Sequence, residues 1–134
     1  MTSEERKPDG EGTRSKGYKD LLVWQKGIVL VKEIYKLTKS FPNDERFGLV
    51  SQMHRAAVSI PSNIAEGQAR HTTKEFVQYI SHAEGSVAEL ETQLVIAMEL
   101  DYCAVGDAVK ASELAAELKR MLNGLRRKLI EIRQ

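Results

Sequence analysis

A line of polar side chains runs beside an apolar stripe between Gln52 and Arg70. Its members recur every three or four residues, which places them on one face of a helix. They are Gln52, Arg55, Ser59, Asn63, Glu66 and Arg70. Such a line can form hydrogen bonds with a matching polar line on another helix, or it can bind a ligand.

A second polar line, made of His82, Ser86, Glu89 and Gln93, has the same spacing in a later segment. If the two segments are antiparallel neighbours, we expect an ion pair between Arg55 and Glu89. The nearby polar groups would supply the further acceptors that a desolvated guanidinium needs. The predicted network comprises Gln52, Arg55, Ser59, Asn63, Glu66, Ser86 and Glu89. We interpret it as structural, since such networks fix register, and direct ligand contact is the alternative.

Positively charged side chains gather near the C-terminus, where Lys119, Arg120, Arg126, Arg127 and Lys128 occur within ten residues. Several of them share one broad helical face, so we predict that they contact the phosphates of a nucleic acid, with Arg70 as a further candidate. A solvated outer helix face is the alternative. The net charge of the chain is only +1, so binding would depend on this local patch. Oligomerisation would multiply it.

The charges are unevenly distributed along the second half of the chain. Residues 72–101 contain six acidic residues and one basic residue, whereas residues 110–133 contain seven basic and three acidic residues. Two helices with these charges could simply attract one another.

No combination of residues indicates catalysis. No glutamate is followed by histidine three residues later, as a di-iron bundle would require, and none of His54, His71 and His82 is followed by a second histidine four residues on. Cys103 has no recognisable triad partners. We therefore predict no catalytic residues, no metal site and no cofactor, and a protein that is not an enzyme.

Four helical segments must position these residues. The first is expected from about residue 18 to 39, with a core-facing seam of Leu21, Trp24, Ile28, Val31 and Tyr35. Four further apolar residues widen this seam: Leu30, Ile34, Leu37 and Phe41. The second should span about 45–69, as one kinked helix around Pro61 or as two helices broken after Ile60. The third should begin after a cap at Thr72 or Thr73 and end near 102–106, with a heptad seam of Phe76, Ile80, Ala83, Val87, Leu90, Leu94 and Ala97. The fourth should span about 106–132, with a seam of Ala115, Leu118, Leu122, Leu125, Leu129 and Ile132.

Long helices with short connections predict an all-α, antiparallel up-down-up-down four-helix bundle over residues 18–134. The wide apolar face of the first helix and the small residues of the second both favour an oligomer. Residues 1–17 lack large apolar side chains apart from Met1, which predicts a disordered tail. A single cysteine and the lack of a signal peptide or membrane span indicate a cytoplasmic protein.

Three stretches together resemble the 23S rRNA intervening-sequence proteins, a family of four-helix bundles. These are YKDLLVWQKG at 18–27, FPNDERFGLVSQMHRAAVSIPSNIAEGQAR at 41–70 and SHAEGSVAELETQL at 81–94. The most specific element is SI-x-x-NIAEG, from Ser59 to Gly67.

The family is similar to the accessory variability protein of diversity-generating retroelements, a pentameric bundle that binds nucleic acid and a reverse transcriptase. The resemblance therefore implies a barrel-like homopentamer and an RNA or DNA partner, although this chain lacks the strongly basic character of the retroelement protein. We predict a non-enzymatic, nucleic-acid-binding oligomer. The alternative is a protein-interaction scaffold, for which nucleic acid is irrelevant.

Overall fold

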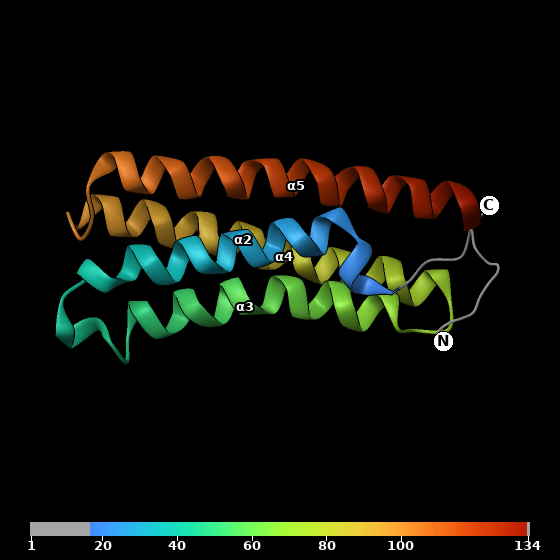
Figure 1. The fold of residues 1–134 in the computed structure, drawn as a ribbon, viewed down its shortest axis with the longest axis horizontal. Helices are drawn as coiled ribbons and strands as arrows, with labels where there is room; N and C mark the ends of the chain where they lie inside the picture. Colours follow the sequence, from blue (N-terminus) through green and yellow to red (C-terminus); the bar gives the residue numbers. More distant parts are fainter. Residues whose placement is uncertain (1–16, 134) are drawn as a thin grey trace.

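Four long helices make up most of the computed structural model, which describes residues 17–133 (Figure 1). They are α2 (Leu22–Leu37), α3 (Leu49–Gln68), α4 (Thr73–Glu99) and α5 (Val105–Arg133). Three short 3-10 turns, η1 (Tyr18–Asp20), η2 (Thr38–Ser40) and η3 (Asn43–Glu45), flank α2 and precede α3. The described residues contain no strand, which confirms the predicted all-α class. The predicted tail falls on residues outside the described range, apart from Gly17.

Each helix packs against two others, in the cyclic order α2, α3, α4, α5. The α3–α4 contact is the most extensive of these and the α2–α5 contact the least. Residue numbers fall along one helix as they rise along its neighbour: Lys119 and Arg126 of α5 contact Glu91 and Glu84 of α4, respectively. This pair of helices is therefore antiparallel.

The centre of the bundle is apolar, and the heptad positions predicted for α4 lie in it. Ile80, Ala83, Val87, Leu90 and Leu94 are all fully buried. Leu118 and Leu122 of α5 are buried as well, whereas Ile132 at the end of the predicted seam is exposed. The spacing of three and four residues thus identified the buried faces of these two helices.

The residues predicted to widen the seam of the first helix are buried, whereas the main line of that predicted seam is not. The buried residues of α2 are Val23, Gly27, Leu30, Ile34 and Leu37. In the main line of the predicted seam, Tyr35 is exposed. The other four residues of that line are only partly buried: Leu21, Trp24, Ile28 and Val31. Gly27 explains the difference, because it has no side chain and allows α2 to approach α3. A Cβ built there would lie 3.5 Å from the ring of Pro61. This approach turns the predicted seam toward the edge of the helix pair.

Helix α3 passes through Pro61 without interruption, so the alternative of two helices broken after Ile60 is wrong. The first two helices are shorter than predicted. Leu21 has an extended backbone that separates η1 from α2, and α3 begins only after Gly48. Thr72 caps α4 as expected: its Oγ1 accepts a hydrogen bond of 3.1 Å from the Glu75 backbone N–H. Among the described helices, none has the length and apolar character that crossing a membrane requires.

Candidate nucleic-acid interface

Two of the basic side chains on α5 are held by carboxylates of α4. Arg126 Nε donates to Glu84 Oε1 at 2.9 Å, and Lys119 Nζ donates to Glu91 Oε1 at 3.1 Å. In each helix the two residues are seven positions apart, so both pairs lie along the same α4–α5 edge. These ion pairs join the acidic and basic helices, and they occupy charges that the sequence pattern assigned to phosphate.

Three other basic side chains of α5 remain available. Arg120, Arg127 and Lys128 are exposed, and within residues 17–133 none of them forms an ion pair. Arg120 and Arg127 are two turns apart on one helix face, about 10 Å along the axis. Of the predicted basic cluster, these three side chains are therefore the ones whose charge is not neutralised by a carboxylate contact.

Arg70 follows the C-terminal end of α3 and contacts one side chain of α3 and one of α4. Its Nη2 atom donates a hydrogen bond of 2.5 Å to the Tyr79 hydroxyl and lies 3.6 Å from Glu66 Oε2. The guanidinium carbon is also 4.8 Å from the centre of the Tyr79 ring. These contacts clamp the α3–α4 turn, so Arg70 is less available to phosphate than the three free side chains of α5.

The structure brings together the middle of the two polar lines. Ser59 Oγ donates to Ser86 Oγ at 2.6 Å across the α3–α4 contact, and Asn63 Nδ2 donates to the Ser59 carbonyl at 2.8 Å within α3. Glu66 pairs with Arg70 one helical turn later. Gln52 is exposed.

The expected ion pair between Arg55 and Glu89 is not formed among the described residues, and both side chains are exposed. Glu89 instead accepts a hydrogen bond of 3.3 Å from Gln93 Nε2. The physical reason is that an exposed ion pair gains little over solvation of its two charges, about 0–1 kcal/mol. The polar line therefore contributes hydrogen bonds to the α3–α4 contact near Ser59, and its outer members face water.

Sequence reasoning did not assign functional roles to Tyr79, Glu84 and Glu91. The sequence contains a pattern that could have predicted the ion pairs of the two glutamates. They are seven residues apart, as are Lys119 and Arg126 on the oppositely charged helix. No such pattern pointed to Tyr79, because its partner Arg70 lies in the turn after α3 and the contact depends on how that turn folds. Gln93, a member of the second polar line, is buried, and its Oε1 atom has no hydrogen-bond partner among the described residues.

Two observations concern metal binding and the cysteine thiol. They contain no group of three or more His, Cys, Asp or Glu side chains that could hold a metal ion. Burial raises the pKa of the Cys103 thiol, and the Asp107 carboxylate acts in the same direction. A raised pKa keeps the thiol protonated and lowers its reactivity.

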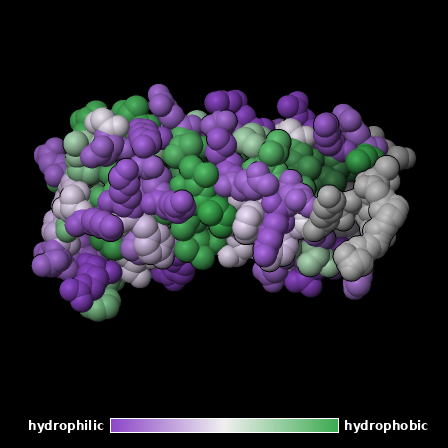
Figure 2. Space-filling view, in the orientation of Figure 1, coloured by the Kyte–Doolittle hydropathy of each residue, from purple (hydrophilic) through white to green (hydrophobic). Residues whose placement is uncertain are grey.

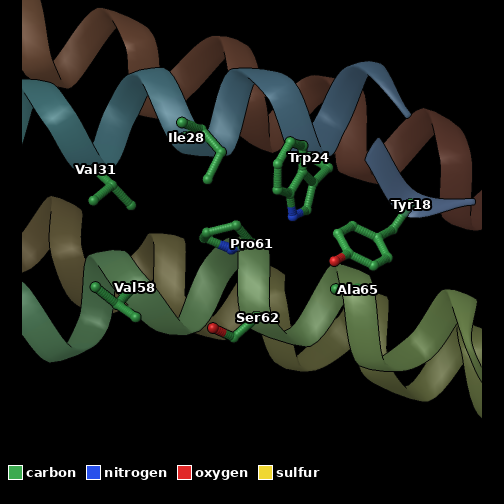
Figure 3. Close-up of a pocket in the computed structure, with 8 residues that line it drawn as sticks. All are labelled: Tyr18, Trp24, Ile28, Val31, Val58, Pro61, Ser62 and Ala65. Carbon is green, nitrogen blue, oxygen red and sulfur yellow. The ribbon is translucent and has the colours of Figure 1, made fainter. Parts of the chain in front are cut away.

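Three largely apolar hollows flank α2, one on its α3 side and two on its α5 side. The α3-side groove, of about 290 Å³, is lined by Trp24, Ile28, Val31, Val58, Pro61 and Ala65, among others (Figure 3). The α5-side groove consists of two hollows of about 510 and 410 Å³ that share Leu22 and Met121. Leu125 and Lys128 also line the first of these hollows, and Val29 and the paired side chains of Lys26 and Glu117 also line the second. Apolar surface of this kind often marks a site of protein contact.

Comparison with known proteins identifies related sequences and structures. Residues 19–124 match the model of a family described as 23S rRNA-intervening sequence protein. A similar crystal structure is that of a protein with unknown function from the S23 ribosomal protein family of Bacteroides thetaiotaomicron. It has a TM-score of 0.73 and 20% identity, and the match covers 79% of this chain and 96% of that chain. No curated protein matches the sequence.

Proposed function

Because the chain belongs to the family of 23S rRNA-intervening sequence proteins, we propose that it is a non-enzymatic, oligomeric protein that binds RNA or another nucleic acid. The interface is the exposed basic surface of α5, formed by Arg120, Arg127 and Lys128. The observation that carries this proposal is the absence of any ion pair at these side chains in the described part of the chain, in contrast to Lys119 and Arg126.

The charge arrangement suits a phosphate backbone better than a compact ligand. Arg120 and Arg127 are far enough apart to contact separate phosphates, and a guanidinium can donate two hydrogen bonds to one phosphate. Base-specific contacts are not required for such binding, since phosphate contacts alone give sequence-independent affinity. One copy offers few charges, so affinity should depend on several copies presenting the surface together.

In this proposal the subunit is an antiparallel up-down-up-down bundle and the assembly is a homopentamer. The first is supported by the antiparallel order of the contacts between α4 and α5, and the second by the resemblance to the pentameric accessory variability protein. The protein would act in the cytoplasm, where its single cysteine would remain a thiol. Native mass spectrometry of the full chain measures the subunit number directly.

A fluorescence anisotropy titration with a structured RNA at low salt tests the nucleic-acid interface. The double variant Arg120→Gln, Arg127→Gln should bind at least several-fold more weakly than the wild type. The matched control is Lys36→Gln, Lys39→Gln, which removes the same charge from two exposed side chains, one at the end of α2 and one in η2. Equal weakening by both variants, or no binding by the wild type, would reject the α5 interface.

The apolar grooves beside α2 favour a second candidate function, a protein-interaction scaffold. Its partner would be another protein, and the resemblance to the accessory variability protein suggests a reverse transcriptase. Affinity capture from a lysate treated with nuclease distinguishes the two functions, since a direct protein partner survives nuclease and an RNA-bridged partner does not.

A further inference from the structure

A cation and two aromatic rings gather at the turn between α3 and α4, apart from the basic surface of α5. The guanidinium carbon of Arg70 lies 4.8 Å from the centre of the Tyr79 ring. The His82 ring contacts the same ring in a T-shaped arrangement, with 5.7 Å between the ring centres. The Arg70 side chain is still 40% exposed with these contacts in place, and His82 is exposed as well. A ligand can therefore reach this cluster.

The Arg70 guanidinium is held in one orientation. Its Nη2 atom donates a hydrogen bond to the Tyr79 hydroxyl and lies 3.6 Å from Glu66 Oε2. Tyr79 in turn packs against Gly67, where a Cβ atom would lie only 2.6 Å from the Tyr79 Cβ. The plane of the guanidinium is thus positioned before any ligand binds, which reduces the entropy that binding costs.

The surroundings of Arg70 favour the use of its plane over the use of its charge. The Glu66 carboxylate lies beside it and offsets its positive charge, so Arg70 suits a phosphate less well than Arg120 or Arg127 does. A guanidinium plane and an aromatic ring are also the groups on which an unpaired nucleic-acid base stacks. Bases inside a duplex already stack on one another and do not offer a free face.

We infer that the Arg70–Tyr79 pair is a stacking site for an unpaired base of a nucleic-acid strand. This inference rests on the proposed function and adds the class of ligand, a single-stranded segment rather than a continuous duplex. Phosphates of that segment contact Arg120 and Arg127, and one of its bases lies on the exposed part of the Arg70 guanidinium. Every base has such a face, so the contact tolerates any sequence.

The stacking site and the α5 surface lie at the same end of the bundle. In Figure 1 the α3–α4 turn and the C-terminal end of α5 are at the same end. Tyr79 precedes Glu84 by five residues, about 7.5 Å along α4, and Glu84 binds Arg126, the neighbour of Arg127. A short strand that crosses α4 can therefore contact both sites.

The part of α4 that such a strand would cross has no free carboxylate. Its exposed residues between positions 74 and 88 are Lys74, Gln78, Ser81, His82, Gly85 and Ala88. The two acidic residues of this stretch are engaged, since Glu84 binds Arg126 and Glu75 exchanges hydrogen bonds with Thr72 at the start of the helix. The acidic character of α4 thus does not repel a strand here.

The other side of the bundle is less suited to a charged strand. Helix α2 is diagonal to α4 in the cyclic order of the helices, and Figure 2 shows hydrophobic surface on the face of the molecule that contains α2 and α3. Because apolar surface does not attract a polyanion, the polar face of α4 is the better path between the two sites.

Two strands with the same phosphates separate stacking from charge. One is a short uridine oligonucleotide, and the other is the same strand with abasic riboses, so only the first offers bases. In anisotropy titrations at one salt concentration, the wild type should bind the strand with bases about 5- to 100-fold more tightly, the effect of one stacked base. Equal affinity for the two strands would overturn the inference.

Substitutions assign this preference to the stacked pair. Arg70→Lys keeps the charge and removes the plane, so it should abolish the preference for the strand with bases. The matched control is Arg55→Lys, because Arg55 is an exposed arginine within α3 for which the described residues show no ring contact; it should keep the preference.

Tyr79→Leu removes the supporting ring and should also abolish the preference, with helix content checked by circular dichroism. A preference that is unchanged in Arg70→Lys would overturn the inference, whatever Tyr79→Leu does.

The proposed function and the stacking site fail in different ways. If the wild type binds neither strand, the nucleic-acid role is rejected and the stacking site with it. If it binds both equally, the stacking site alone is rejected. The variant Arg120→Gln, Arg127→Gln should weaken the binding of both strands by the same factor and leave the preference intact, because it removes phosphate contacts only.

Discussion

Gly67 of α3 lies directly against Tyr79 of α4: a Cβ atom at Gly67 would be 2.6 Å from the Tyr79 Cβ and 3.0 Å from Phe76 Cδ1. No larger residue fits this contact without moving the helices apart. The same contact supports the Tyr79 side chain that holds Arg70. The α3–α4 turn is therefore fixed by close packing as well as by polar contacts.

Gly67→Ala should consequently destabilise the protein by about 1–3 kcal/mol, the usual cost of overpacking. Gly85→Ala is the matched control, because nothing lies within 4 Å of a Cβ built at Gly85 in the middle of α4. That change should stabilise the protein by about 0.5–1 kcal/mol, since alanine loses less backbone entropy in a helix. Urea unfolding of both variants measures the difference; a Gly67→Ala protein as stable as the wild type would contradict the close packing of Gly67 against Tyr79.

The sequence pattern predicted most accurately the helices with a narrow apolar stripe. In α4, Ile80, Val87 and Leu94 leave one possible inward face, and that face is buried. In α2, apolar residues cover most of the helix, so spacing alone could not select between the seam of Trp24 and that of Leu30. The close approach of Gly27 to Pro61 determines which face of α2 is buried. The pattern of one helix cannot predict this contact, because it depends on how α2 and α3 pack against each other.

The candidate nucleic-acid interface was also predicted only in part from the sequence. Its residue types and its helix were evident, because the cluster from Lys119 to Lys128 has no counterpart elsewhere in the chain. Which charges are free was not evident, since it depends on how α5 is rotated against α4. That rotation directs Lys119 and Arg126 toward Glu91 and Glu84.

Removing the α4 carboxylates should strengthen nucleic-acid binding. In Glu84→Gln, Glu91→Gln the side chains of Arg126 and Lys119 no longer have ion-pair partners and become available to phosphate. RNA affinity should rise, and its salt dependence should steepen by up to about 0.7–0.9 per added phosphate contact. The control Glu113→Gln, Glu131→Gln removes the same charge from exposed positions of α5. An equal increase in affinity in both double variants would show that only net charge matters.

The pH dependence of stability should report on His54. Its ring stacks on Tyr35 with 3.7 Å between ring centres, and its Nε2 lies 2.8 Å from Thr38 Oγ1. Burial lowers the pKa of His54 below its ordinary value of 6.5. The unfolded chain therefore takes up this proton before the folded one does, and the free energy of unfolding should decrease as the pH falls below about 6.5.

The variant His54→Phe tests this expectation, because it keeps an aromatic ring on Tyr35 and removes the titrating group. Urea unfolding between about pH 7.5 and 5.5 should show a smaller decrease of stability in the variant than in the wild type. Parallel decreases in the two proteins would assign the pH dependence to other groups.

The salt dependence of RNA binding tests the central claim most directly. A plot of log Kd against log salt concentration should be steep for the wild type and shallower for Arg120→Gln, Arg127→Gln, Lys128→Gln. The slope should fall by about 0.7–0.9 for each phosphate that the triple variant no longer binds. The matched variant Lys32→Gln, Lys36→Gln, Lys39→Gln should retain the wild-type slope. Identical slopes for the wild type and both triple variants would contradict the assignment of the interface to α5.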